Sequence, residues 1–395
     1  MRIKLRQAFD LQMGKTPARN RPDYWNGDHK WISIADIGNA GKFLTKTKES
    51  ITKAGIDGSG IKVVPQGTVI MSFKLSIGKT AITSEDMYTN EAIMAFIDNG
   101  KFAVDTDYLY HLCCGTNWTA GTNKAVMGLT LNKATLLEKE IPLPDINEQH
   151  EIATKLDKID AIIAERQQQL ELIDQAVKSR FIELFGDPVS NSMGLPTEPM
   201  TTVCAIIDGD RGKNYPKQDE FSDTGYCLFL NAKNVTATGF SFENRMFITK
   251  EKDDALHNGK LERGDVVLTT RGTLGNLAFY DDSVPFENVR INSGMVILRM
   301  KKSVMTEVFF MEQFKLQLQS IKGKIASGSA QPQLPISTMN KIRILLAPMA
   351  LQEQFAAFVE QTDKSKYYSS LSFRYCQAAA NTYRQEWMTC RTSDF

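Results

Sequence analysis

Cysteine and histidine are scarce in this chain of 395 residues, and their arrangement excludes several kinds of site. The six cysteines form no C-x-x-C motif, and the adjacent pair Cys113 and Cys114 suits neither a zinc site nor an easy disulfide. The chain has four scattered histidines, His29, His111, His150 and His257. A Ser-His-Asp arrangement would therefore need assembly from distant segments. We expect reduced thiols, no metal site and no catalytic residues.

Motifs that bind phosphate or a nucleotide cofactor are also absent. The sequence GKT at Gly14 and at Gly78 looks like the end of a phosphate-binding loop, but the glycine needed five residues earlier is replaced by Phe9 or Phe73. There is no G-x-G-x-x-G, H-E-x-x-H or G-x-S-x-G sequence. The Pro-Pro of a methyltransferase loop that holds a flipped base is missing too. The sequence therefore indicates a protein that binds rather than reacts.

Long apolar runs and an excess of one charge are lacking as well. No run approaches the roughly eighteen apolar residues of a membrane span, and residues 1–10 alternate charged and apolar residues instead of forming a signal peptide. The formal net charge is only +1, so any basic surface must be local. With 42% hydrophobic and 24% charged residues, we expect a cytoplasmic protein of two or three domains without a membrane partner.

What the chain does contain is an internal repeat. VPQGTVIMSFKLSIGKTAI (64–82) aligns without gaps on LERGDVVLTTRGTLGNLAF (261–279). Each copy predicts a glycine turn, an apolar strand, a basic residue, a hydroxyl two residues further on, and a second glycine. The matched residues at the strand end are Lys74 with Arg271, Ser76 with Thr273, and Gly78 with Gly275.

Three further segments recur in the same order along the chain. They are GKTP at Gly14 with GKNYP at Gly212, WISIADI at Trp31 with CLFLNAKNV at Cys227, and NEQ at Asn147 with QEQ at Gln352. The repeat is far longer than a solenoid unit, so we interpret the chain as a tandem duplication of a mixed α/β domain followed by a helix.

The helix that follows each domain has a heptad pattern. From Asn147, a seam of apolar residues at three-, four- or seven-residue spacing includes Ile152, Leu156, Ile159, Ile163, Leu170, Ile173, Val177 and Leu184, with Arg166 at the remaining position. Gly186 and Pro188 end this helix. The second helix, from Met349 to about Trp387, has a poorer seam that we place at Leu351, Phe355, Phe358, Leu371, Tyr375 and Ala378. We expect an antiparallel pair; two unrelated helices, each on its own domain, are the alternative.

Loops and strand ends in both halves carry side chains suited to DNA. Arg reads guanine, Asn and Gln read adenine, and Lys, Ser and Thr also bind phosphates. The candidate DNA-binding residues of the first half are Lys15, Thr16, Arg19, Arg21, Lys74, Ser76 and Lys79. Those of the second half are Arg211, Lys213, Asn214, Tyr215, Arg271, Thr273, Gln331 and Gln333. For any single residue, a solvated loop without a specific partner is the alternative.

The segments IPLPDINEQHEIATKLDKID (141–160) and LAPMALQEQFAAFVEQTD (346–363), each behind a variable domain, resemble the specificity (S) subunit of Type I restriction-modification systems. The resemblance covers nearly the whole chain. It implies two target-recognition domains, 1–144 and 188–348, separated by a central helix, 145–187, and a C-terminal helix, 349–395. The expected fold class is α+β, a tandem pseudo-two-fold repeat with two long antiparallel coiled-coil-like helices.

The same resemblance implies partners. A non-catalytic subunit of this kind directs two adenine methyltransferase (M) subunits and the restriction (R) subunits to a split, asymmetric double-stranded DNA site. S-adenosylmethionine, ATP and Mg would then bind to the partner subunits and not to this chain. The outer helix faces would serve as docking surfaces through Glu151, Lys155, Lys158, Glu165, Arg166 and Gln169.

Two other readings remain open at the level of the sequence. A self-contained methyltransferase or nuclease is disfavoured by the missing cofactor glycines and base-holding loop. A coiled-coil scaffold with two protein-binding heads stays compatible with the near-neutral charge, because a DNA-binding protein that depends on phosphate contacts usually has more exposed cations.

Overall fold

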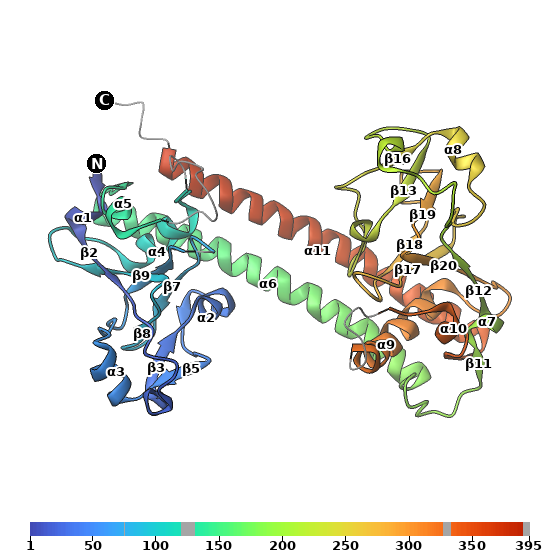
Figure 1. The fold of residues 1–395 in the computed structure, drawn as a ribbon, viewed down its shortest axis with the longest axis horizontal. Coiled ribbons are helices and arrows are strands. Elements are labelled where there is room, and N and C mark those ends of the chain that lie inside the picture. The colour runs from blue at the N-terminus through green and yellow to red at the C-terminus, as the bar shows by residue number, and fades with distance from the viewer. Residues whose placement is uncertain (75, 120–130, 327–332, 390–395) are drawn as a thin grey trace. The chain divides into compact units, whose positions relative to one another are not determined.

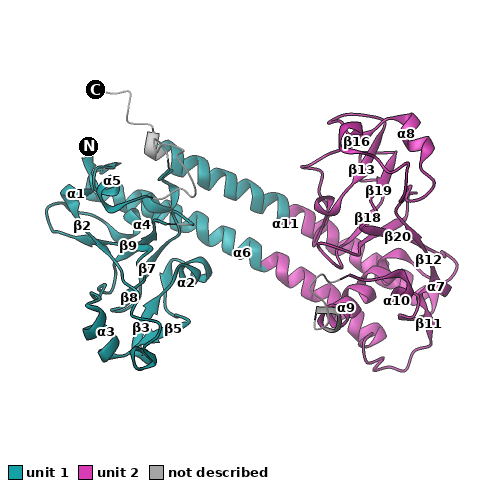
Figure 2. Cartoon of the chain, in the orientation of Figure 1, with its two compact units in different colours: residues 1–168, 370–395 teal, residues 169–369 magenta. Residues whose placement is uncertain are grey.

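The computed structural model describes residues 1–74, 76–119, 131–326 and 333–389 (Figure 1). The chain divides into two compact units, which are coloured separately in Figure 2. Unit 1 contains residues 1–168 and 370–395, and unit 2 contains residues 169–369. No helix in the described ranges is both long and apolar enough to cross a membrane.

Unit 1 is built on a five-stranded sheet and a three-stranded sheet. The first has the order β2 (Phe9–Met13), β9 (Ile93–Asp98), β6 (Val69–Ser72), β7 (Thr80–Thr83) and β4 (Phe43–Leu44). The second has the order β5 (Glu49–Ile51), β3 (Trp25–Ile32) and β8 (Tyr88–Thr89). A separate antiparallel pair joins β1 (Arg2–Lys4) to β10 (Glu140–Pro142). The helices are α1 (Leu5–Ala8), α2 (Ile34–Asn39), α3 (Lys53–Ser59), α4 (Thr106–Gly115) and α5 (Lys133–Leu137).

Unit 2 repeats this plan with a four-stranded and a three-stranded sheet. One has the order β12 (Cys204–Asp208), β20 (Met295–Met300), β17 (Asp265–Thr269) and β18 (Leu277–Tyr280). The other has the order β16 (Phe247–Ile248), β13 (Cys227–Leu230) and β19 (Val289–Ile291). Two short pairs join β14 (Val235–Thr236) to β15 (Gly239–Phe240) and β11 (Thr197–Pro199) to β21 (Arg343–Leu345). The helices are α7 (Met200–Val203), α8 (Lys250–Ala255), α9 (Glu307–Ala326) and α10 (Ile336–Met339).

The central strands are buried on both faces. Val69 and Met71 of β6 lie in the core that contains residues of α4, whereas Ile70 lies in the core on the other face of the sheet. In unit 2, Val266 and Val267 of β17 likewise lie in two different cores, one on each face of the sheet. Because neighbouring residues of a strand point to opposite faces, two cores require an unbroken apolar run, as the sequence has in both copies.

Two long helices were expected, and the structure confirms them. Helix α6 spans Ile146–Phe185 and α11 spans Met349–Thr389. In unit 2, the rings of Phe181 in α6 and Phe355 in α11 are 5.5 Å apart, and Lys366 Nζ lies 2.5 Å from Asp174 Oδ1. The later residue of α6 meets the earlier residue of α11, so the two helices run antiparallel there.

The predicted seam of α6 is confirmed, because all of its predicted positions are buried or half-buried. The predicted seam of α11 is wrong beyond its first turns. Leu371 and Tyr375 are 53% and 76% exposed, and Ala378 is exposed too. The seam continues at three- and four-residue spacing through Ser369, Phe373, Cys376, Ala380 and Tyr383, all half-buried or buried. Ser369, Cys376 and Ala380 are small residues that alternate with Phe373 and Tyr383 along this seam, whereas the prediction relied mainly on Leu371 and Tyr375.

The structure also corrects the alignment at the start of the long helices. Gln149 Oε1 accepts a hydrogen bond from Asp105 N at 2.9 Å, and Gln352 Oε1 accepts one from Thr306 N at 2.9 Å. Each amide nitrogen donates to two backbone carbonyls, and both side chains are fully buried. Gln149 is therefore equivalent to Gln352. The predicted alignment of NEQ with QEQ paired Asn147 with Gln352 instead, which is an error of two residues.

The turn after the first sheet strand needs a similar correction. Gly14 directly follows β2 and Gly209 directly follows β12. A side chain on either would overlap backbone, since a Cβ atom on Gly14 would lie 2.0 Å from Thr89 O and one on Gly209 would lie 2.2 Å from Asn292 O. Gly209 is therefore the equivalent of Gly14, and the pairing of Gly14 with Gly212 is wrong.

Candidate nucleic-acid interface

A hydroxyl group organises the tip of the β6–β7 hairpin in unit 1. Ser72 Oγ donates to the carbonyl oxygen of Ser76 and accepts from Lys79 N at 3.1 Å. Ser72 N donates to Lys79 O at 2.9 Å, and Gly78 N donates to Ser72 O at 2.9 Å. Gly78 has φ +91°, a conformation that side chains with a Cβ atom rarely adopt. These bonds fix the backbone of the hairpin tip.

The β17–β18 hairpin of unit 2 has the same hydrogen bonds at the equivalent residues. Thr269 Oγ1 donates to Thr273 O and accepts from Asn276 N at 2.9 Å. Thr269 N donates to Asn276 O at 3.0 Å, and Gly275 N donates to Thr269 O at 2.8 Å. Gly275 has φ +80°. The repeat found in the sequence is thus a repeated backbone frame.

The two frames present different side chains. Unit 1 carries Lys74, Ser76 and Lys79 on its hairpin, and unit 2 carries Arg271 and Thr273. The side chains of Lys79 and Arg271 are exposed and have no ion pair among the residues that the structure describes. Two hairpins with the same backbone and different exposed side chains suit two domains that recognise different DNA sequences. The backbone sets the position of each side chain, and the side chain sets the base preference.

The segment that follows α4 or α9 returns to the hairpin. Leu131 N donates to Phe73 O at 3.3 Å, and in unit 2 Leu334 N donates to Thr270 O at 3.1 Å. Gln333 is exposed and directly precedes Leu334, so it lies beside the β17–β18 hairpin. Gln331, predicted on the same loop, lies outside the described residues.

In the loop after β2, both arginines are held by carboxylates of the same unit. Arg19 forms two hydrogen bonds with Glu49, and its guanidinium lies 3.9 Å from the ring centroid of Trp25. Arg21 Nη2 lies 2.7 Å from Asp23 Oδ2. These contacts order the two side chains but also neutralise much of their charge, so the positive potential available to a DNA phosphate is reduced.

The other two predicted residues of this loop also have partners. Lys15 Nζ donates to Ser59 O at 3.2 Å, and Thr16 Oγ1 donates to Glu91. All four side chains of the loop therefore take part in its local structure. Their role in DNA binding stays a prediction.

In the corresponding loop of unit 2, three of the four predicted side chains have local partners. Arg211 Nη2 lies 3.0 Å from Asp208 Oδ2, and Asn214 Nδ2 donates to a backbone carbonyl of α8 at 3.0 Å. The ring of Tyr215 lies edge-on to a buried phenylalanine of β13. Lys213 is exposed, with no ion pair to any described residue. Lys213 and Arg271 are thus the free cations among the predicted residues of unit 2.

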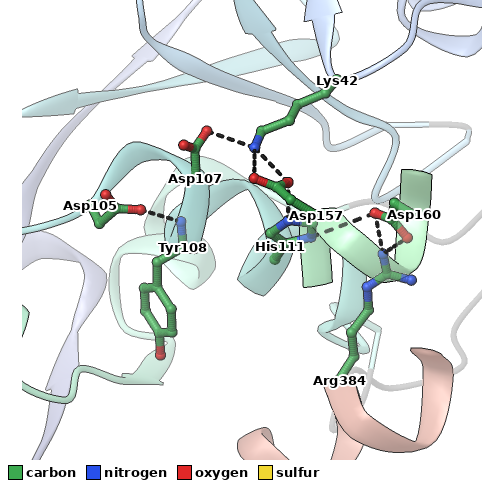
Figure 3. Close-up of polar contacts among 8 residues, drawn as sticks. All are labelled: Lys42, Asp105, Asp107, Tyr108, His111, Asp157, Asp160 and Arg384. Carbon is green, nitrogen blue, oxygen red and sulfur yellow. Dashed lines mark hydrogen bonds and ion pairs between the residues drawn. The ribbon is translucent and has the colours of Figure 1, made fainter. Parts of the chain in front are cut away.

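A polar cluster between α4 and α6 was not predicted from the sequence (Figure 3). Lys42 Nζ lies 2.7 Å from Asp157 Oδ1 and 2.8 Å from Asp107 Oδ1. His111 Nε2 lies 2.8 Å from the same Asp157 oxygen. Burial raises the pKa of Asp157, but its hydrogen bonds with Lys42 and His111 outweigh burial and hold that pKa below the ordinary value. Asp157 is therefore a carboxylate that joins α4 and the segment before β4 to α6.

The cluster extends to α11 through a second carboxylate. Arg384 Nη2 lies 2.6 Å from both oxygens of Asp160, whose Oδ2 is 3.8 Å from His111 Nδ1. Burial lowers the pKa of His111, against the carboxylates that raise it. The spacing of Asp157 and Asp160 beside the apolar seam is the sequence signal that could have located this cluster.

The predicted docking residues lie along α6 within unit 1, except Gln169, which begins the part of α6 in unit 2. Glu151, Lys155, Lys158, Glu165 and Gln169 are exposed, and Lys155 Nζ lies 2.5 Å from Glu151 Oε1. Arg166 is half-buried at its seam position. The exposed five are compatible with a docking surface, which stays a prediction for all six.

The chain matches the family model of the Type I restriction modification DNA specificity domain twice, at residues 1–173 and 201–367. The MjaIX specificity subunit of Methanocaldococcus jannaschii is 24% identical to this chain, covering 90% of the chain and 85% of the relative. The EcoR124I/EcoR124II specificity subunit of Escherichia coli is 27% identical but covers 38% of each sequence.

Solved structures support the fold. The S subunit of a Type I restriction-modification system from M. genitalium matches with a TM-score of 0.56 and 15% identity, covering 98% of this chain and 96% of that one. A chain from a structure of type I R-M complex assembly and conformational transition matches with a TM-score of 0.55 and 15% identity, covering 98% and 97%. Two mixed α/β domains with two long helices are thus the shared architecture.

Proposed function

This chain belongs to the Type I restriction-modification DNA specificity family, and from that premise we propose that each unit reads one half of a bipartite, asymmetric DNA site. The chain is the DNA sequence-recognition subunit of a restriction-modification complex. The observation that carries the proposal is the hairpin pair. Equivalent bonds from Ser72 and Thr269 hold hairpins whose exposed side chains differ. Two hairpins with the same backbone and different exposed side chains account for a DNA site whose two halves differ in sequence.

The remaining chemistry is assigned to partners. The chain is a non-catalytic subunit, and two M subunits with S-adenosylmethionine methylate adenines in the two half-sites. R subunits use ATP and Mg for restriction. The complex acts in the cytoplasm. The exposed polar face of α6 supports docking of the M subunits, because it presents both charge signs outward while the apolar seam faces α11.

The long helices also set the distance between the half-sites. Helix α6 has 40 residues and α11 has 41. At about 1.5 Å per residue each extends over roughly 60 Å. A continuous helix is stiff, so a fixed number of base pairs between the two half-sites follows from its length.

The test is to sequence genomic DNA from a host that expresses this chain with its methyltransferase subunits, and to map the methylated adenines. A host that lacks this chain but keeps the methyltransferase is the control. We expect a bipartite motif that is absent from the control. If methylation is active but no motif depends on this chain, a scaffold with two protein-binding heads becomes the better description.

A further inference from the structure

Residues 43–48 of unit 1 comprise the short strand β4 and an exposed basic loop that follows it. Phe43 is 54% exposed, and Lys46 and Lys48 are exposed as well. Neither lysine side chain has an ion pair or hydrogen bond with any residue in the described ranges. In contrast to Arg19 and Arg21, these two cations keep their full charge for a partner.

The loop is held firmly beneath these exposed side chains. Leu44 is fully buried, and Lys30 Nζ donates to Thr45 O at 2.7 Å. Lys48 N donates to Asp36 Oδ1 at 3.0 Å. The other oxygen of Asp36 accepts from the backbone and hydroxyl of Ser33 at the start of α2. The loop backbone is therefore ordered before any ligand arrives, which reduces the entropy lost on binding.

The exposed side chains border a hollow of about 390 Å³. Its walls include Asn39, Phe43, Lys46 and Lys48, and its one acidic lining residue, Asp36, already accepts the hydrogen bonds described above. The lining thus combines two free cations, one amide and one exposed aromatic ring. This set matches DNA, because ammonium groups bind phosphates and amide or aromatic side chains contact base edges.

Strand β4, which leads into the loop, pairs with β7 of the β6–β7 hairpin. Phe43 pairs with Ile82 of β7, three residues after the hairpin residue Lys79. The ammonium of Lys79 contacts α2 so closely that a Cβ atom on Gly38 would lie 2.6 Å from Nζ. Lys79 therefore lies against α2, whose residues Asp36 and Asn39 also line the hollow with Lys46 and Lys48.

We infer that residues 43–48 form a second DNA-contact element of unit 1, in which Lys46 and Lys48 bind backbone phosphates and Phe43 contacts a base edge in the first half-site. This inference rests on the proposed function and adds residues to its DNA-binding surface. Lys42, which precedes the loop, is a positioning residue because its ion pair with Asp157 ties the loop to α6. A duplex bound at the hairpin would then also be contacted by the loop.

The test uses the complex of the full chain with its methyltransferase subunits and a labelled duplex that carries the methylated motif. Affinity is measured between about 50 and 200 mM salt for the wild type, K46A/K48A and F43A. The matched control is K62A/K101A, because both lysines are exposed in the same unit near β2, at the opposite edge of the sheet from β4. Assembly of each complex is checked by size-exclusion chromatography.

Loss of two phosphate contacts should lower the slope of log affinity against log salt by about 1.8 and weaken binding equally on all duplexes. F43A should reduce discrimination against a mutated first half-site about tenfold and leave the second half-site unchanged. The control should behave as the wild type. Wild-type affinity, slope and discrimination in both test variants would overturn the inference, as would loss of complex assembly, which would identify the loop as a protein-docking surface. A wild-type complex without any sequence preference would instead refute the proposed function.

Discussion

Asp157 accepts hydrogen bonds from Lys42 at 2.7 Å and from His111 at 2.8 Å through the same carboxylate oxygen. One residue of α6 thereby fixes both α4 and the chain segment that leads into β4. Lys42 has a side chain only 20% exposed, so its ammonium depends on the carboxylates of Asp157 and Asp107.

Replacing Lys42 by Met should lower the free energy of unfolding by about 1–2 kcal/mol, because Asp157 and Asp107 would lose a partly buried counter-ion. K42R should restore most of this loss. Urea unfolding followed by circular dichroism measures both. As a control, K155A removes the solvent-exposed ion pair with Glu151 and should change stability much less than K42M. Equal effects of K42M and K155A would contradict the role assigned to Lys42.

His111 should make stability fall in mildly acidic solution. Burial holds its pKa below the ordinary value of 6.5, so the folded chain binds the imidazole proton less readily than the unfolded chain. The stabilisation is complete above pH 6.5 and is lost as the pH falls through the folded pKa. Thermal unfolding between about pH 7.5 and 5 should show a smaller decline in H111Q than in the wild type. The same decline in both proteins would show that other groups control this range.

The buried glutamines should be important for stability in both units. Gln149→Ala and Gln352→Ala each leave one backbone N–H and two carbonyls without partners, which should cost about 2–4 kcal/mol. Gln168→Ala, at an exposed position of α6, is the control and should change stability by under about 0.5 kcal/mol. Differential scanning calorimetry can assign each loss to one unit. A loss in the wrong unit would contradict the equivalence of the two residues.

Arg271→Ala or Lys213→Ala should affect only the half-site that unit 2 reads. If a base contact is lost, discrimination at one position should fall by about 1–3 kcal/mol, and the methylated motif should become degenerate there. Equal weakening on every duplex would indicate a phosphate contact instead. Sequencing methylated adenines from hosts that express each variant distinguishes the two outcomes, and degeneracy in the other half-site would show that the units were assigned wrongly.

An insertion of four residues next to Gln168 should lengthen the spacer of the recognised site. The insertion adds about one helical turn, or roughly 6 Å, and ten base pairs occupy about 34 Å. We therefore expect a motif with one or two additional base pairs between unchanged half-sites. The control replaces four existing residues next to Gln168 by the same four residues, so that the length of the helix does not change. A motif with the original spacer, in a complex that still methylates, would refute the role of the helices in spacing.

Several features of the fold were predictable because they depend on local sequence. Glycine turns flank the apolar run of β6 and that of β17, so the repeated hairpin was visible before its hydrogen bonds. The α6 seam was equally clear, since Leu156 and Val177 are large apolar residues at regular spacing and both are buried. The α11 seam was missed because Ser369 and Cys376 do not stand out as core residues, and only packing against the partner helix selects them.

The sequence by itself determined the duplication, the two long helices and the family, because all three are written in the order and spacing of residues along the chain. The tertiary structure decided which side chains are available to DNA. Arg19 and Lys46 are both cations in polar loops, yet Arg19 is paired with Glu49 and Lys46 has no such partner among the described residues. Glu49 lies 30 residues from Arg19, and a pairing across that distance depends on how the strands fold together, which residue spacing alone does not specify.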